Sequence, residues 1–365
     1  MKVIISVISD LVTDQRVHKT AQLLHEEGYE VLLLGRKLHH SAAMSPKDYQ
    51  YKRVKLPFET GPLFYASYTI WNFFFLLFHK ADILHANDLD TLLPNFLVSK
   101  IKNIPLVYDS HEYFTGVPEI QDRKMVKYIW TVLEQFIFPK LKHVYTVNES
   151  IAQKYEAQYK VKVGVVRNVP FLLEVNKHDQ LHDLPVAATI VYQGALNVDR
   201  GLEEMILAMQ FIDQAKLMII GVGDVEKQLH ELVRVNQLTD KVVFKGRLKY
   251  DEMMQVTKLC TLGISIEKPT NDNYKLCLPN KLFDYLHVGV PVIASRLVEV
   301  AAVINRYEVG GFIDNHDPRH IASCINLILH DQVLLSKWKK NTMAARLACN
   351  WQDESGLIKK IYAKL

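Results

Sequence analysis

The segment LPNKLFDYLHVGVPVIAS (278–295) carries two ionisable side chains, Lys281 and Asp284, in the first turns of a predicted short helix. Pro279 and Asn280 open that helix, and residues three apart in a helix face the same side. A helix start offers unpaired N–H groups and a positive dipole end, which suits a phosphate group. Lys281 adds a cation there, and Asp284 can accept two hydrogen bonds from the hydroxyls of a ribose. The helix therefore predicts a site for a nucleotide diphosphate.

Other strand ends in the second half of the chain carry glycine and arginine residues that fit the same chemistry. Glycine lets the backbone approach a ligand closely, and arginine makes charge-assisted hydrogen bonds to phosphate. The residues concerned are Gly194, Arg200, Gly246 and Arg247. Plainer interpretations exist, because a Gly-x-Gly such as 221–223 is common and Lys281 with Asp284 could form a surface ion pair of little energy. The prediction depends on the convergence of these loops.

An alternation of short apolar strands and helices runs through the whole chain and would position these loops. Near-continuous apolar strands separated by helices indicate parallel sheets covered on both faces. The predicted fold class is α/β, with two doubly wound, Rossmann-like domains facing each other across a cleft. Ligands of such sheets bind at the carboxyl ends of the strands, which predicts a site between the halves. The predicted strands are 2–8, 30–35, 82–86, 105–109, 143–147, 163–166, 189–194, 216–223, 241–246, 261–266, 291–295 and 310–314.

The alternation breaks at VPFLLEVNKHDQLHDLPVAA (169–188), where prolines and charges show no clear period. Such a stretch is typical of a domain boundary, and a chain of 365 residues has the length of two domains. We therefore expect an N-terminal domain over 1–170, a C-terminal nucleotide-binding domain over 171–348 and a final segment over 349–365.

The composition is that of an ordinary globular protein, with 49% hydrophobic and 23% charged residues. Four widely spaced cysteines form no C-x-x-C pair, which argues against a zinc site or a disulfide scaffold and fits a reducing cytoplasm. The N-terminus has only a short apolar run before Asp10, so we expect a strand there and no secretory signal. The net charge of +4 is small and lacks an aromatic-basic motif, so we expect no nucleic-acid partner.

The excess of positive charge lies in the first half, with 21 basic against 17 acidic residues in 1–170 and 23 against 23 beyond. This half suits an anionic partner or membrane surface, and it equally fits a solvated surface of mixed charge. The segment LFYASYTIWNFFFLLF (63–78) is aromatic-rich, but its 16 residues fall short of the roughly 20 that cross a bilayer. We expect a helix buried against the sheet, with an interfacial membrane anchor as the alternative.

The order of the motifs in the second half resembles the C-terminal half of the retaining GT-B glycosyltransferases, the group 1 family with a Glu-x7-Glu motif. Those motifs are GALNVDRG (194–201), GVGD (221–224), FKGRL (244–248) and the segment 278–295. The first half is similar to the same family in DQRVHKTAQLLHEEGYEV (14–31), PLVYDSHE (105–112), YTVNES (145–150) and VVRNVP (165–170). The end of the chain, 349–365, resembles the family's helix that crosses back to the N-terminal domain.

The resemblance implies a metal-independent, retaining glycosyltransferase of the hexosyltransferase type, with a nucleotide-diphosphate sugar as substrate and no cofactor. It implies that Arg200 contacts the donor diphosphate beside the turn at Gly194, that Asp284 binds the ribose, and that Gly246 and Arg247 border the base. The backbone that would hold the distal phosphate belongs to Asn280, Lys281 and Leu282.

On the N-terminal side, His111 would approach the transferred sugar, while Glu112 and Asp88 are the candidates that orient the acceptor hydroxyl. His111 could instead be a structural histidine within its loop. The resemblance suits a lipid-linked or polysaccharide acceptor in cell-surface glycan synthesis. We accordingly expect a cytoplasmic protein with a peripheral contact at the inner face of the plasma membrane.

Two alternatives keep the architecture and change the function. One is a nucleotide-sugar epimerase, which would need acid and base carboxylates and no acceptor. The other is a non-catalytic relative that binds a nucleotide or scaffolds a partner enzyme. It is suggested by Leu276, which stands where the family has its first glutamate, and by Ala195, which stands where it often has an arginine. Asp284 stands in place of the second glutamate.

Two motifs imitate metal sites. DLD (88–90) matches an Asp-x-Asp metal signature, yet we expect Asp88 to contact an acceptor hydroxyl or to cap a helix. HDPRH (316–320) places two histidines four apart, but Pro318 disrupts a helical zinc pair and favours a surface turn.

Overall fold

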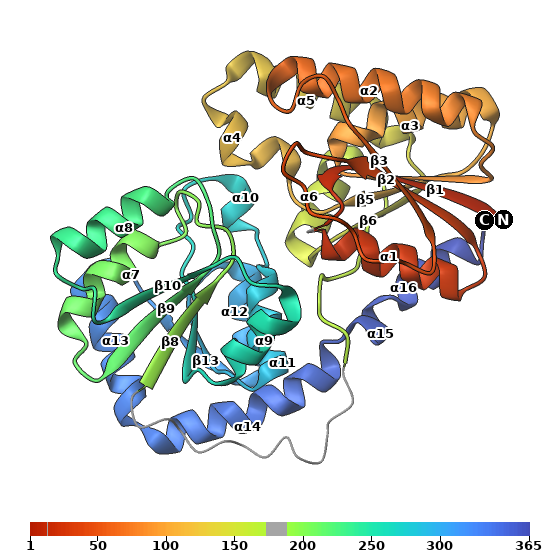
Figure 1. The fold of residues 1–365 in the computed structure, drawn as a ribbon. Helices are drawn as coiled ribbons and strands as arrows, with labels where there is room; N and C mark the ends of the chain where they lie inside the picture. The colour runs from red at the N-terminus through yellow and green to blue at the C-terminus, as the bar shows by residue number, and fades with distance from the viewer. Residues whose placement is uncertain (13, 173–187) are drawn as a thin grey trace. The chain divides into compact units, whose positions relative to one another are not determined.

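The computed structural model describes residues 1–12, 14–172 and 188–365, and the chain divides into two compact units (Figure 1). Unit 1 comprises Met1–Asn168 together with Glu354–Leu365, and unit 2 comprises Val169–Asp353. Only the two ends of the expected boundary stretch 169–188 are described, and 173–187 lies outside the described residues. The C-terminal residues thus belong to the same unit as the N-terminal strand.

Unit 1 is built on a seven-stranded parallel sheet of order β3-β2-β1-β4-β5-β6-β7. The strands are β1 (Lys2–Asp10), β2 (Glu30–Arg36), β3 (Gln50–Val54), β4 (Ile83–Asn87), β5 (Leu106–Ser110), β6 (His143–Thr146) and β7 (Gly164–Val165). Strand β3 is absent from the predicted strands, because its residues are polar and basic. As the edge strand of the sheet, β3 pairs on one side only and tolerates such residues.

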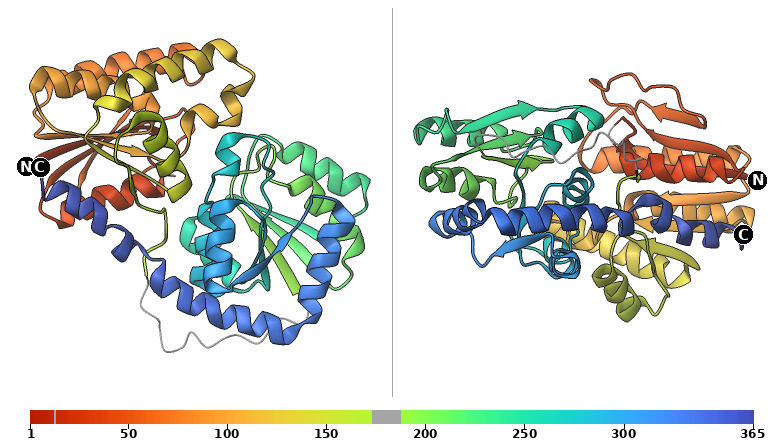
Figure 2. Two further views of the ribbon diagram at one scale, coloured as in Figure 1. Left: turned by 180° about the vertical axis from the view of Figure 1, so that it is seen from behind. Right: turned by 90° about the horizontal axis from the view of Figure 1, so that it is seen from below.

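Helices cover both faces of this sheet. Figure 1 shows α2, α3 and α5 on one face, and α1 and α16 on the other. The helices of unit 1 are α1 (Gln15–Glu26), α2 (Gly61–Phe78), α3 (Leu89–Lys102), α4 (Pro118–Gln121), α5 (Lys124–Ile137), α6 (Glu149–Tyr159) and α16 (Gly356–Tyr362). In α16, the Tyr362 hydroxyl lies 2.9 Å from Nδ1 of His85 on β4, and both chain ends lie at the same end of this unit (Figure 2). The C-terminal helix α16 therefore packs against the same sheet as the N-terminal part of the chain.

Helix α2 corresponds to the aromatic segment 63–78. One face is buried and includes Tyr68 and Asn72, while Ile70, Phe74 and Phe78 are exposed on the other. The prediction of a buried helix therefore holds for one face only. Among the residues that the structure describes, no helix has the length and apolar character needed to span a membrane.

Unit 2 is built on a six-stranded parallel sheet of order β10-β9-β8-β11-β12-β13. Its strands are β8 (Ala188–Gln193), β9 (Ala215–Ile220), β10 (Val242–Gly246), β11 (Leu262–Ser265), β12 (Val292–Ser295) and β13 (Gly310–Ile313). Its helices are α7 (Leu202–Ala208), α8 (Glu226–Val235), α9 (Tyr250–Lys258), α10 (Asp272–Lys275), α11 (Asn280–Val288), α12 (Val298–Tyr307), α13 (Pro318–His330) and α14 (Gln332–Ala348), with α15 (Trp351–Glu354) at the junction with unit 1. The predicted strands of this half are all present.

The strand order of each sheet reverses at one point, between β1 and β4 in unit 1 and between β8 and β11 in unit 2. In doubly wound sheets, ligands bind outside the carboxyl ends of the strands at such a switch point. In unit 2 these ends lead into Gly194 and into Glu267, and in unit 1 the end of β4 leads into Asp88. The topology thus places polar residues where a ligand of either sheet is expected.

Candidate functional site

Glycine residues join the three loops that follow β8, β9 and β10 at the carboxyl edge of the unit 2 sheet. The Gly194 N–H donates to the Ile220 carbonyl at 3.0 Å, and the Gly221 N–H donates to the Gly246 carbonyl at 2.8 Å. Gly221 has a φ of +145°, and a Cβ placed on it would lie 1.9 Å from the Gly194 carbonyl oxygen. The Gly-x-Gly at 221–223 is therefore required by close loop packing.

Two cations share one carboxylate beside these loops. Lys281 Nζ lies 2.8 Å from Glu267 Oε1, and Arg200 Nη1 lies 3.7 Å from the same oxygen. Lys281 Nζ also lies 3.8 Å from the centre of the Tyr192 ring, and the Arg200 guanidinium lies 4.8 Å from that of Tyr274. Among the described residues, the buried Nε of Arg200 has no hydrogen-bond partner. The cluster carries a net positive charge and a free donor, which are properties of an anion site.

Glu267 is fully buried, and its other oxygen accepts a hydrogen bond from Ser265 Oγ at 2.8 Å. Burial disfavours the charged form, but Lys281 and Arg200 outweigh it and hold the pKa of Glu267 below its ordinary value. The carboxylate is therefore ionised at neutral pH. Glu267 is not among the residues predicted from the sequence, and its signal there is a charged residue directly after the apolar run 261–266.

Asp284 lies in the interior and not on the surface. Its Oδ2 accepts from Gln193 Nε2 at 2.9 Å, and its Oδ1 accepts from the Tyr250 hydroxyl at 2.8 Å. Because Lys281 and Asp284 are both buried and Lys281 pairs with Glu267, the alternative of a surface ion pair between them is wrong. The contact of Asp284 with a ribose stays a prediction.

The remaining predicted donor residues differ in their surroundings. Asn280 is exposed as the first residue of α11, whereas Leu282 is fully buried and its N–H donates to the Pro279 carbonyl at 3.1 Å. Gly246 ends β10 with a φ of +64°, and the Arg247 that follows is exposed. The structure thus gathers Gly194, Arg200 and Lys281 in one cluster, because a Cβ on Gly194 would lie 3.7 Å from Lys281 Cε.

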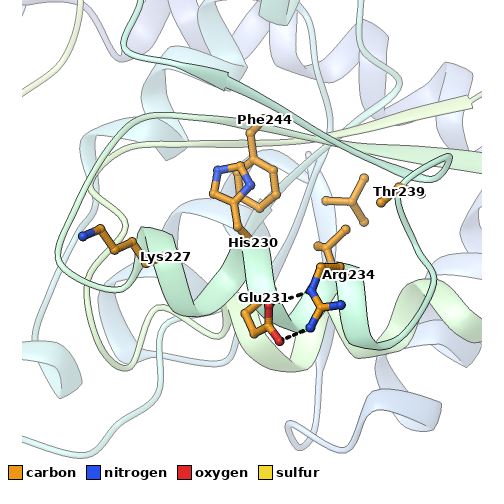
Figure 3. Close-up of a pocket in the computed structure, with 8 residues that line it drawn as sticks. Lys227, His230, Glu231, Arg234, Thr239 and Phe244 are labelled. Carbon is orange, nitrogen blue, oxygen red and sulfur yellow. Dashed lines mark hydrogen bonds and ion pairs between the residues drawn. The ribbon is translucent and has the colours of Figure 1, made fainter.

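A pocket of about 510 Å³ lies elsewhere in unit 2, between α8 and the edge strand β10 (Figure 3). His230 stacks on Phe244 with 3.9 Å between the ring centres, and Arg234 pairs with Glu231 on the exposed side of α8. Its lining residues differ from the predicted donor residues. We therefore place the candidate site at the Lys281 cluster.

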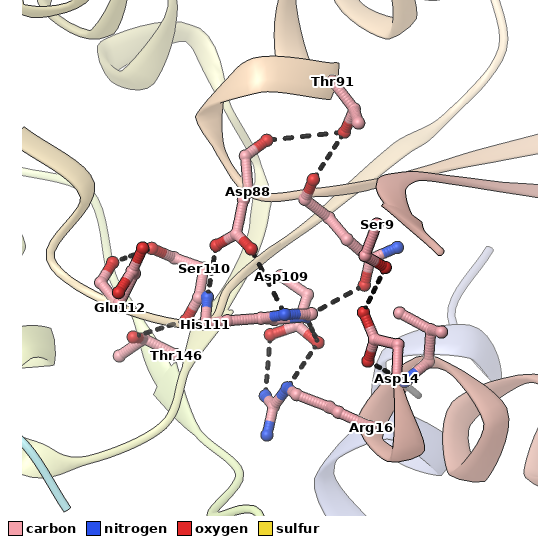
Figure 4. Close-up of polar contacts among 12 residues, drawn as sticks. Ser9, Asp14, Arg16, Asp88, Thr91, Asp109, Ser110, His111, Glu112 and Thr146 are labelled. Carbon is pink, nitrogen blue, oxygen red and sulfur yellow. Dashed lines mark hydrogen bonds and ion pairs between the residues drawn. The ribbon is translucent and has the colours of Figure 1, made fainter. Parts of the chain in front are cut away.

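Unit 1 holds a second polar cluster, centred on His111 (Figure 4). His111 Nδ1 lies 3.2 Å from Asp88 Oδ2, and Nε2 lies 3.2 Å from Asp109 Oδ2 and 3.1 Å from Asn87 Oδ1. The backbone N–H of His111 also donates to Asp88 Oδ1 at 2.7 Å. Burial lowers the pKa of His111, but Asp88 and Asp109 outweigh it and raise that pKa to about 9. The ring is therefore a cation at neutral pH, held between two carboxylates.

Arg16 completes this cluster from α1. Its Nε and Nη2 donate to Asp109 at 2.9 and 2.7 Å, and its Nη1 donates to the Val166 carbonyl at 2.9 Å. Burial opposes the charge on Asp109, but Arg16 and His111 outweigh it and hold the pKa of Asp109 well below its ordinary range. Neither residue of this ion pair is among those predicted from the sequence. Their signal in the sequence is a carboxylate at the end of a predicted strand and an arginine within a predicted helix.

Asp88 occupies the N-cap position of α3 with a φ of +59°, but its side chain makes no capping hydrogen bond. Burial raises the pKa of Asp88, although the charge on His111 opposes this effect. The Asp88 carboxylate forms an ion pair with His111. Glu112 is half-buried, and its backbone carbonyl accepts from Ser110 Oγ at 2.8 Å.

Asp90, the other carboxylate of DLD, is buried. Within the described part of the chain, no group of three histidine, cysteine, aspartate or glutamate residues is arranged to hold a metal ion.

HDPRH (316–320) begins helix α13 and is not a simple surface turn. Asp317 caps α13, and its Oδ1 accepts from the Arg319 and His320 N–H groups at 3.0 Å each. His316 Nε2 lies 3.0 Å from the Ile266 carbonyl oxygen, next to Glu267. The motif therefore starts a helix.

Comparisons with known proteins agree with this architecture. The family model described as Glycosyl transferases group 1 matches residues 174–344, and that described as Glycosyltransferase Family 4 matches residues 14–170. A sulfoquinovosyl transferase of Arabidopsis thaliana is 21% identical over 271 residues, which cover 69% of this chain and 51% of that protein. The chain thus spans about half the length of this curated relative.

Solved structures resemble the whole chain. Sucrose-phosphate synthase from Thermosynechococcus elongatus has a TM-score of 0.79 at 15% identity and covers 100% of this chain and 98% of its own. Anabaena HepE in complex with UDP and glucose has a TM-score of 0.75 at 16% identity over 100% of both chains. WaaG, a glycosyltransferase involved in lipopolysaccharide biosynthesis, has a TM-score of 0.75 at 14% identity over 98% of both.

These likenesses confirm the predicted two-domain, Rossmann-like GT-B fold. The two family matches run from residue 14 to residue 344 with only a short gap between them. The chain therefore belongs to the group 1 glycosyltransferases.

Proposed function

We propose that this glycosyltransferase moves a hexosyl group from a nucleotide-diphosphate sugar to a lipid-linked or polysaccharide acceptor, with retention of configuration and without a metal ion. The observation that carries the proposal is the pair of cations in unit 2. Lys281 and Arg200 converge on one carboxylate, and the buried Nε of Arg200 has no hydrogen-bond partner in the described part of the chain. A diphosphate supplies the negative charge that this pair lacks. The relative HepE, solved with UDP-glucose, supports a nucleotide sugar as donor.

The chemistry of transfer explains why the cations matter. The bond between the anomeric carbon and the diphosphate oxygen breaks, and its electron pair stays on the leaving diphosphate. The acceptor hydroxyl attacks the same face of the sugar and passes its proton to the leaving oxygen. Negative charge therefore grows on the diphosphate, where Lys281, Arg200 and the start of α11 stabilise it by preorganised electrostatics. These groups take the part that a divalent cation plays in metal-dependent transfer.

For unit 1 we propose the acceptor side of the reaction. His111 carries a positive charge and would donate to a hydroxyl of the transferred sugar, with Asp88 and Glu112 orienting the acceptor hydroxyl. Both ring nitrogens of His111 face carboxylates, those of Asp88 and Asp109. Contact with the sugar therefore requires His111 to exchange one of these partners.

We further propose that unit 1 binds the anionic inner face of the plasma membrane, where a lipid-linked acceptor would be available. Helix α5 turns Met125, Tyr128, Ile129, Val132 and Phe136 to solvent, at spacings that lie on one helical face. A globular helix ordinarily buries such a face. The ring of Tyr65 on α2 lies 5.5 Å from that of Trp130 on α5, so α5 is in contact with the aromatic helix α2.

Charge supports a lipid surface as the occupant of this face. Exposed basic residues lie near this face: Arg123 and Lys124 stand at the start of α5, Lys140 lies over the ring of Phe136, and Lys100 and Lys140 both lie over the ring of Phe96. An apolar face rimmed by lysine and arginine matches the chemistry of an anionic interface, in which rings enter the acyl boundary and cations remain at the headgroups.

The donor is tested by titration calorimetry with UDP-, GDP-, ADP- and TDP-sugars. We expect heat of binding from one nucleotide family, and its loss in Arg200→Ala. The matched control is Arg234→Ala, because Arg234 is an exposed arginine of the same unit that pairs with Glu231 on its own helix. Absence of binding for all four families, or equal binding by Arg200→Ala, would contradict the proposal. EDTA should leave the turnover of the wild type unchanged.

A further inference from the structure

Lys281 and Arg200 both pair with Glu267, which lies in the loop that follows β11 at the switch point of the unit 2 sheet. It follows the end of β11 by two residues, and Ser265 on that strand fixes its second oxygen at 2.8 Å. Full burial and two engaged oxygens leave it no surface for a sugar hydroxyl. A direct contact with the transferred group is therefore not its role.

Electrostatics gives Glu267 two opposite effects at the same place. Without a ligand, its charge offsets the repulsion between two neighbouring cations, and it holds Lys281 Nζ in a fixed position. When a diphosphate binds the same cations, the carboxylate repels it across a short, poorly hydrated distance. The charge of Glu267 thus stabilises the two neighbouring cations and lowers their affinity for the diphosphate.

We propose that Glu267 is a positioning residue that acts as an internal counter-anion: it prepares Lys281 and Arg200 for the donor and weakens their hold on the nucleoside diphosphate product. This inference rests on the proposed function, since it requires the diphosphate to bind at these cations. The electron pair that the leaving diphosphate gains in transfer raises its negative charge. A fixed carboxylate next to that group therefore favours release of the product.

The test compares wild type with Glu267→Gln by calorimetry, using UDP, GDP, ADP, TDP and inorganic pyrophosphate. The glutamine side chain has the same size, and its oxygen can still accept a hydrogen bond from Lys281. Because the negative charge is removed, the net charge of the cluster rises by one. We expect the Kd of the diphosphate to fall on the order of tenfold. We also expect a lower Tm of the ligand-free variant, because the two cations lose their counter-charge. Glu267→Asp, which restores the charge, should return the Kd toward that of wild type.

The opposite signs of these effects separate the inference from a merely structural role. A structural role would lower the Tm and weaken binding together, so an unchanged or higher Kd in Glu267→Gln overturns the inference. Binding of no diphosphate by wild type would instead overturn the proposed function and the inference with it.

A second comparison serves if Glu267→Gln alone does not fold. In Lys281→Gln, Glu267 faces Arg200 only, and adding Glu267→Gln restores the net charge of the wild-type cluster. The double variant should then bind pyrophosphate more tightly than Lys281→Gln alone. Equal or weaker binding by the double variant would overturn the inference.

Discussion

Arg16 and Asp109 stand 93 residues apart in the sequence and form a two-pronged, buried ion pair in unit 1. The distances from Nε and Nη2 to the carboxylate are 2.9 and 2.7 Å. The same carboxylate faces His111 Nε2 at 3.2 Å. One acidic side chain at the end of β5 therefore fixes both helix α1 and the candidate histidine.

Asp109→Asn should destabilise the protein strongly. The substitution leaves the charge of Arg16 buried without its counter-ion, which costs about 3–5 kcal/mol in the free energy of unfolding. Urea unfolding at pH 7 measures the loss. Glu231→Gln is the control, because it removes the charge of an exposed pair with Arg234 and should leave stability nearly unchanged. Similar small effects in both variants would contradict the account of this cluster.

His111 should titrate well above an ordinary histidine. Its pKa is raised from 6.5 to about 9, since Asp88 and Asp109 outweigh the effect of burial. The native state then keeps a proton that the unfolded chain releases, so the contribution to stability is complete below pH 6.5 and is lost as the pH rises through 9. NMR titration of the ring gives the midpoint directly. A midpoint near 6.5, or stability that does not fall over this interval, would refute the prediction.

The sequence predicts the strands and helices better than it predicts which polar side chains pair with one another. Parallel strands buried on both faces leave near-continuous apolar runs, which is why β1 and β12 are readable, whereas the polar edge strand β3 is not. Lys281 is predicted from its position at a helix start, whereas its partner Glu267 lies in the loop after β11. Pairing across the sheet depends on strand order, which a single sequence does not display.

The same reasoning explains the N-terminal cluster. The motif that contains His111 predicts this residue, but Arg16 and Asp109 meet only because α1 packs beside the end of β5. The buried, ionised state of such residues follows from their neighbours and not from their residue types. Helix α2 shows the converse, since its composition predicts burial and the structure leaves one face exposed.

Lys281→Met should impair both stability and donor binding. Glu267 would remain buried with only Arg200 at 3.7 Å, which costs on the order of 3 kcal/mol. The diphosphate would lose a charge-assisted contact, so its Kd should rise at least tenfold. Lys227→Met, at an exposed lysine of α8, is the matched control for calorimetry and urea unfolding. Unchanged binding in Lys281→Met would remove this lysine from the donor site.

The exposed face of α5 should control membrane binding. Ile129→Glu combined with Phe136→Glu places two carboxylates on a face that we propose enters an anionic bilayer, so cosedimentation with phosphatidylglycerol vesicles should fall several-fold. Phosphatidylcholine vesicles should bind the wild type weakly, because they lack the negative charge. Leu327→Glu, at an exposed leucine of α13 in unit 2, is the control and should bind like wild type. Equal binding by all three proteins would show that this face has another purpose.

Gly221→Ala should disrupt the loops that support the donor site. The new Cβ would lie 1.9 Å from the Gly194 carbonyl oxygen, and the φ of +145° is strained for any L side chain. Backbone atoms must shift to relieve the overlap, so we expect a loss of roughly 3 kcal/mol or more in the free energy of unfolding, together with weaker pyrophosphate binding. Gly28→Ala separates strain from overlap, since Gly28 has a φ of +86° and no atom within 4 Å of its added Cβ. That control should cost only about 1 kcal/mol and leave pyrophosphate binding intact. Equal losses in the two variants would mean that conformation alone, and not the contact between the loops after β8 and β9, requires glycine at 221.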